Sequence, residues 1–138
     1  KSSQETDLMF RLILNNRNNK IIIDKSLLTI IRERETGQIS QGNPIEKWNQ
    51  YIKVRLNFIE SLKKSHEQEY ALNKEIYFDY LMLSVITLAK YDMDKACKIY
   101  NQHLKQNWSA SGNFGFTKVK VFLIKWFGLK TFLKFKKN

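Results

Sequence analysis

Apolar side chains after Asn43 recur at steps of three and four residues, and this spacing is the sequence feature that most limits the fold. Asn43-Pro44 is a typical helix start, because Asn caps free backbone N–H groups and Pro fits the first helical position. The apolar positions that follow line one side of a helix reaching Leu62: Ile45, Trp48, Ile52, Leu56, Ile59 and Leu62. One Pro and five Gly in 138 residues leave little room for turn-dense β structure, so the sequence predicts a mainly α fold.

Further helices are predicted downstream of Leu62. His66 to Glu69 is a polar break or the start of the next helix, and Ile76 to Leu88 is almost continuously apolar, which is typical of a central, buried helix. Asp92 or Asp94 begins another helix, whose apolar face contains Ala96, Ile99, Tyr100 and Leu104. Residues 109–115 are predicted to form a Ser/Gly/Asn linker, and Phe116 to Phe135 are predicted to form one helix. We therefore expect an irregular bundle of about four to five helices.

The N-terminal segment has a different pattern. Glu5 and Asp7 open a short amphipathic helix, at the end where the helix dipole favours acids. The apolar, β-branched-rich runs 21–23 and 27–31 predict a short β-hairpin-like segment, and the polar residues 32–43 predict a loop. These differences divide the chain into an N-terminal part, 1–43, and a helical module, 44–138.

Residues 3–40 resemble the end of the catalytic domain of family 2 glycosyltransferases, which have the GT-A fold. Asp7-Leu8 and Arg11 match the family's short helix, and residues 22–27 match the strand that follows it. Arg32 matches an arginine at the end of that strand, and Gln38-Ile39-Ser40 matches the turn beyond it. The remaining residues are similar in helical character to the tail of such an enzyme.

The resemblance implies roles for four residues. Glu5 stands where the family has its general base, although Asp is commoner there and Gln4 replaces the usual first acid. Arg34 stands where the family often has a metal- or diphosphate-binding His; together with Gln38 and Ser40 it is expected to bind the diphosphate or the acceptor side. The alternative for Glu5 is that it only complements the helix N-terminus.

The expected activity is transfer of a hexose-type sugar from a nucleotide-sugar donor to a glycan or lipid-linked acceptor, in bacterial surface polysaccharide synthesis. The donor-binding portion and its Asp-x-Asp metal motif are expected upstream of Lys1. A divalent metal is therefore expected in the full-length enzyme but not in this fragment, which should be inactive alone.

Basic charge is concentrated in the C-terminal third. Residues 95–138 hold ten Lys and no acid, whereas residues 1–94 hold all 13 acids. An anionic membrane surface is one candidate partner, contacted by residues that combine charge and aromatic character: Lys118, Lys120, Lys125, Trp126, Lys130 and Lys134. An equal alternative is a terminal helix that packs its apolar side on the bundle and points its lysines outward. Nucleic acid is not predicted as a partner, because this segment has no Arg and no recognisable nucleic-acid-binding motif.

Other signals narrow the class of protein. The sequence has one Cys, no secretory signal and no run of 18 apolar residues, which favours a cytoplasmic protein, or one held at the inner face of the membrane. His66 and His103 lack companions at ligand spacing, so no metal site is predicted. A non-catalytic helical interaction module is the alternative to an enzyme, because residues 70–107 also resemble one tetratricopeptide-like helix pair.

Overall fold

The protein is a bundle of α-helices, described by a computed structural model for residues 4–15 and 43–135. Its elements are α1 (Gln4–Asn15), α2 (Pro44–Ser65), α3 (Glu67–Leu88), α4 (Met93–Ile99), the π-helical turn η2 (Tyr100–Leu104), α5 (Lys118–Phe127) and α6 (Leu129–Phe135). These ranges contain no β-strand, so the mainly α prediction is confirmed. The hairpin predicted around residues 21–31 lies outside the described residues.

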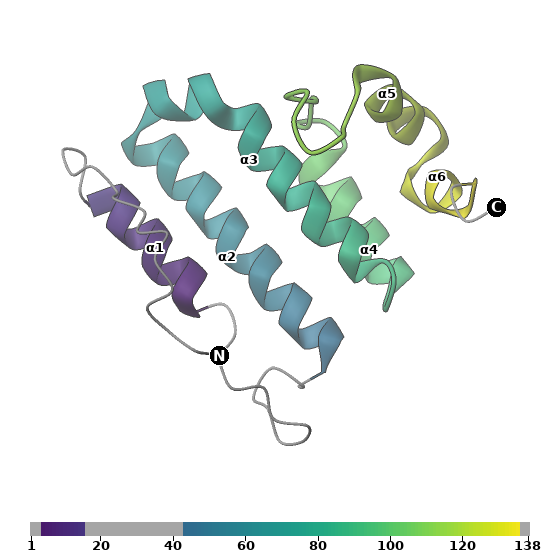
Figure 1. The fold of residues 1–138 in the computed structure, drawn as a ribbon, viewed down its shortest axis with the longest axis horizontal. Helices are drawn as coiled ribbons and strands as arrows, with labels where there is room; N and C mark the ends of the chain where they lie inside the picture. Colours follow the sequence, from purple (N-terminus) through teal and green to yellow (C-terminus); the bar gives the residue numbers. More distant parts are fainter. Residues whose placement is uncertain (1–3, 16–42, 136–138) are drawn as a thin grey trace, which may run out of the picture.

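Helices α2 and α3 form the antiparallel pair around which the bundle is built (Figure 1). Helix α2 begins as predicted: Pro44 is its first residue, and the Asn43 side-chain oxygen accepts a hydrogen bond from the Ile45 N–H at 3.0 Å. The backbone N–H of His66 donates a hydrogen bond to the Leu62 carbonyl at 2.8 Å, at the C-terminal end of α2. Helix α3 starts at the next residue, so the polar stretch after Ser65 is a helix start rather than an extended break.

Helix α3 is the most buried element, as its apolar run predicts. It lies between α2 on one side and α4 on the other, and therefore buries two faces (Figure 1). Its core positions include Leu81, Met82, Val85 and Leu88, all fully buried. A helix with two buried faces needs apolar residues nearly all round, which explains why this segment shows no clear polar side.

A buried carboxylate ties the segment after η2 to α3. Asp79 has no exposed surface, and it accepts hydrogen bonds from the Trp108 indole N–H at 2.7 Å and from the Ser111 hydroxyl at 2.6 Å. The Ser111 backbone N–H donates to the same carboxylate at 3.1 Å. The predicted Ser/Gly/Asn linker is therefore non-helical, as expected, but fixed against the core.

The C-terminal segment differs from its prediction. Instead of one helix from Phe116 to Phe135, the chain forms α5 and α6, separated by Gly128. Gly128 has φ 81° and ψ 157°, a conformation that is essentially restricted to glycine. With this break the described residues contain six α-helices, more than the four to five that were predicted.

The helices follow one another across the molecule. Helix α1 packs against α2, with the Phe10 and Phe58 rings stacked at 4.0 Å between centroids. Helices α5 and α6 lie at the end of the bundle farthest from α1, where α6 contacts α4 (Figure 1). Helix α1, which contains Glu5, and helices α5 and α6 thus lie at opposite ends of the bundle.

Candidate functional site

The predicted glycosyltransferase residues lie at the N-terminal end of the chain. The backbone of Glu5 is in the first turn of α1, as predicted, but the placement of its side chain is outside what the structure describes. Asp7 forms an ion pair with Arg11 one turn later, which agrees with its interpretation as a helix-start residue. Arg34, Gln38 and Ser40 lie outside the described residues.

Helix α5 is fixed by a polar start and an apolar face. The Thr117 hydroxyl accepts a hydrogen bond from the Lys120 N–H at 3.3 Å and so caps the helix. The Lys120 ammonium group donates to the Gly115 carbonyl at 2.8 Å. Val121 and Ile124, three residues apart, are buried in the core. These contacts fix which side of α5 faces outward.

The outward side of α5 is also apolar. Val119, Phe122 and Trp126 lie three and four residues apart, and between 59% and 71% of each residue is exposed. The Phe122 and Trp126 rings pair with centroids 5.6 Å apart. Phe127 and, in α6, Phe135 are exposed as well. We call these five residues the α5–α6 apolar surface.

Lysines border this surface. At 3.6 residues per turn, Lys118 and Lys125 lie along one edge of the exposed apolar side of α5, and Lys120 lies along the other. In α6, the Lys130 ammonium lies 3.0 Å from the Asp94 carboxylate, and this hydrogen bond raises the pKa of Lys130. Lys134 is exposed. This segment therefore has one feature of each alternative. It packs its apolar side on the bundle, and it also presents an exposed apolar face bordered by lysines, as a membrane contact would require.

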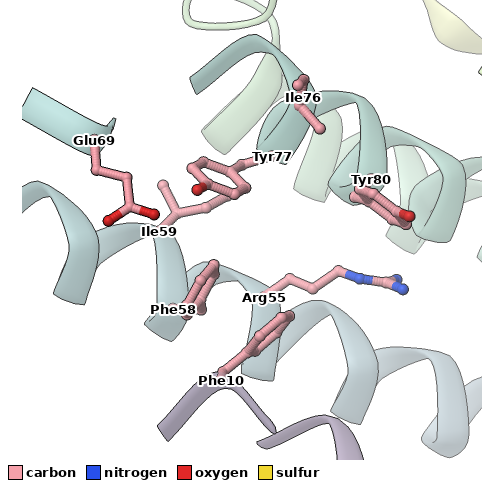
Figure 2. A pocket seen from close by; sticks show the side chains of 8 residues that line it. All are labelled: Phe10, Arg55, Phe58, Ile59, Glu69, Ile76, Tyr77 and Tyr80. Carbon is pink, nitrogen blue, oxygen red and sulfur yellow. The ribbon is translucent and has the colours of Figure 1, made fainter. Parts of the chain in front are cut away.

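A second site, not predicted from the sequence, lies between α1, α2 and α3. It is a cavity of about 450 Å³. Most of its walls are aromatic or aliphatic, with one basic and one acidic residue: Phe10, Arg55, Phe58, Ile59, Glu69, Ile76, Tyr77 and Tyr80 (Figure 2). The Phe58 and Tyr77 rings meet edge to face at 5.5 Å and close one wall. A volume in this range is typical of small-molecule sites.

Arg55 is the cation of this cavity. Its guanidinium carbon lies 5.7 Å from the Tyr51 ring centroid and 5.8 Å from that of Tyr80, which are cation–π distances. Burial lowers the pKa of Arg55, against smaller opposing effects of the two tyrosines. The ion pairs within residues 4–15 and 43–135 join Asp7 to Arg11 and Asp94 to Lys130, and neither involves Arg55. In the sequence, this site is signalled by the spacing of Arg55, Phe58 and Ile59, because residues three and four positions apart lie on the same face of a helix.

In the described ranges no three His, Cys, Asp or Glu side chains gather to hold a metal ion. None of the helices in these ranges is long and apolar enough to cross a membrane. Burial raises the pKa of the Cys97 thiol, which makes it a weaker nucleophile.

Comparisons with known proteins give no relative. No family model, no curated protein and no solved structure matches the chain.

Proposed function

We propose that this chain is the C-terminal part of a nucleotide-sugar-dependent glycosyltransferase that transfers a hexose-type sugar to a glycan or lipid-linked acceptor in bacterial surface polysaccharide synthesis. The observation that carries the proposal is the pattern of residues 3–40, in which Glu5 precedes Asp7-Leu8 at a fixed spacing. The start of α1 at Gln4 supports it, because Glu5 then belongs to the first turn of a helix.

The proposed chemistry gives Glu5 a proton to remove. Inverting transfer needs a base within hydrogen-bond reach of the acceptor hydroxyl while the nucleotide diphosphate leaves from the opposite face of the sugar. A helix N-terminus stabilises a carboxylate in its ionised form, which is the form a base requires. Arg34 is proposed to pair with the diphosphate, since its guanidinium can donate two parallel hydrogen bonds to phosphate oxygens. The divalent metal is placed in the donor-binding portion of the whole enzyme, and no step proposed here depends on it.

The test uses the full reading frame that contains this chain, with transfer measured from a panel of nucleotide-sugars. We expect Glu5→Gln to lower kcat by at least about a hundredfold, because a general base contributes roughly 10²- to 10⁴-fold. Asp7→Asn is the matched control on the same helix turn, and it should retain activity since Asp7 is paired with Arg11. Equal activity of Glu5→Gln and the unmodified enzyme would disprove the base assignment.

A second proposed function is attachment to an anionic membrane surface, and a specific observation favours it. The α5–α6 apolar surface leaves Trp126 and Phe122 exposed beside Lys118 and Lys125. Aromatic side chains enter the interface between headgroups and acyl chains, while neighbouring lysines pair with anionic lipid. The segment 118–135 contains no acid that would oppose this contact. Such attachment would hold an enzyme close to a lipid-linked acceptor.

Vesicle flotation tests this second function. The chain should float with vesicles of phosphatidylglycerol and phosphatidylcholine and remain behind with phosphatidylcholine alone. The double variant Lys118→Gln/Lys125→Gln should weaken partitioning about thirtyfold, at about 1 kcal/mol per lysine near an anionic surface. Lys98→Gln/Lys105→Gln, on exposed lysines outside this surface, is the control. Equal loss in both double variants would assign the attraction to overall charge, and no flotation with either vesicle would remove the proposal.

A further inference from the structure

The cavity between α1, α2 and α3 joins two chemical environments. Most of its wall is formed by rings and aliphatic side chains, among them Phe10, Phe58 and Ile76. The Arg55 side chain runs past the Phe10 ring, and its guanidinium lies beside Tyr80 at the end of the cavity away from Glu69 (Figure 2). An apolar body would fit the wall, and only a group that accepts hydrogen bonds would satisfy the cation.

The surroundings of the Arg55 guanidinium indicate that the ligand of this cavity carries an anionic group. Arg55 is half-buried, and its described neighbours are the faces of Tyr51 and Tyr80 rather than a carboxylate. Ring faces attract a cation but leave its N–H groups without acceptors in the ring plane. A carboxylate or phosphate placed against the guanidinium would accept two parallel hydrogen bonds in a partly desolvated setting, where such bonds are strong.

Glu69 sets the direction of binding. It lines the other end of the cavity, beyond Phe58 and Tyr77, and its carboxylate points toward the cavity (Figure 2). Its negative charge disfavours an anionic head at that end. A ligand with one anionic head would therefore enter with the head at Arg55 and its apolar part toward Tyr77.

We propose that this cavity binds an amphiphilic anion, with a carboxylate or phosphate head on Arg55 and an apolar body along Phe10, Phe58 and Ile76. The proposal does not depend on the glycosyltransferase assignment, because it uses only side chains of the described helices. A fatty carboxylate and a lipid phosphate share this chemistry, and the choice between them is left to the experiment.

The test titrates the intact chain with octanoate, octyl phosphate and the neutral octyl glucoside, each kept below its micelle concentration. Binding is followed by NMR through the ring protons of Tyr77 and Tyr80, with Tyr91 outside the cavity as the internal reference. At least one of the two anions should bind about tenfold more tightly than octyl glucoside, because a charge-assisted hydrogen bond is worth about a factor of ten or more. The tighter of the two anions identifies the head group.

Variants separate this site from the rest of the basic surface. Arg55→Gln should weaken the anion about tenfold and leave octyl glucoside unchanged, whereas Trp126→Ser, in the α5–α6 apolar surface, should change neither. Ile76→Trp fills the cavity and should abolish binding of all three probes. Leu72→Trp, one turn earlier on α3 at a residue that is 84% exposed, should bind like the original chain.

Three results would overturn the proposal. One is equal affinity for the neutral probe and both anions, and another is unchanged anion binding in Arg55→Gln. The third is a shift confined to Trp126, which would place the anions on the α5–α6 apolar surface instead. If Arg55→Gln does not fold, the comparison of Ile76→Trp with Leu72→Trp still decides, because neither variant changes a charge.

Discussion

Asp79→Ala is expected to lower the free energy of unfolding by about 3–5 kcal/mol. The Asp79 carboxylate is completely buried and accepts three hydrogen bonds, from the Trp108 indole at 2.7 Å and from the hydroxyl and backbone N–H of Ser111 at 2.6 and 3.1 Å. A hydrogen bond to a charged group is worth about 1.5–3 kcal/mol, and a buried donor left without a partner adds its desolvation cost. Because the Ser111 groups are only partly buried and can reach water, the loss should be nearer to two such bonds than to three.

Asp79→Asn gives an intermediate test of the same reasoning. One side-chain oxygen would still accept from the Trp108 indole, but the new amide nitrogen would face the donors of Ser111. We expect a loss of about 1.5–3 kcal/mol, roughly one charge-assisted hydrogen bond. The backbone of α3 should be unaffected, because Asn and Asp have similar shapes.

Urea unfolding, followed by helical circular dichroism and by tryptophan fluorescence, measures both losses. The control is Asp94→Ala, since the Asp94 side chain is 88% exposed in its pair with Lys130 and should contribute less than about 1 kcal/mol. If Asp79→Ala unfolds within about 1 kcal/mol of the unmodified protein, the network does not stabilise the fold as argued. An unchanged slope with urea would show that the change lies in stability rather than in compactness of the unfolded chain.

Tyr100 and Gly128 should also affect stability, through a buried hydroxyl and a strained backbone respectively. Burial raises the pKa of Tyr100 to about 12, and its hydroxyl has no hydrogen-bond partner among the described residues. The unfolded chain loses this proton from about pH 10, so the free energy of unfolding should fall by up to about 3 kcal/mol between about pH 10 and pH 12. In urea titrations, Tyr100→Phe should remove that fall and should leave the free energy of unfolding at neutral pH unchanged. Gly128→Ala should destabilise the protein by about 1–3 kcal/mol in the same assay, through backbone strain at φ 81°, since no atom lies within 4 Å of the added Cβ.

Helix starts could be predicted because their causes are local. The Asn43 side chain and the Pro44 ring act within two residues of the helix they begin, and Asp92 likewise caps α4 by accepting from the Lys95 N–H at 2.9 Å. The buried run in α3 was predictable for a related reason. Its apolar residues follow one another without a polar side, so no orientation of the helix could expose them all.

Asp79 shows why part of the core was not predicted. An acid within the apolar run Phe78 to Leu83 signals a polar partner, but its donors are 29 and 32 residues away: Trp108 directly precedes the segment predicted as a linker, and Ser111 lies within it. The cavity depends on similar long-range contacts. Phe10 of α1 stacks on Phe58, which is 48 positions later in the chain, and no local feature of the sequence predicts where α1 docks.

The break at Gly128 explains why the character of the tail was ambiguous in the sequence. A continuous helix would have a single apolar stripe, and the lysines would have to be sorted around it. With α5 ending at Phe127, Val121 and Ile124 pack inward, and Phe122 and Trp126 are left on the outer side. Phe122 and Trp126 are 59% and 71% exposed, so contact with an anionic, apolar surface would bury apolar area that the bundle itself leaves in water. The exposed aromatic side chains beside lysines, rather than the basic composition alone, are therefore what supports the proposed membrane contact.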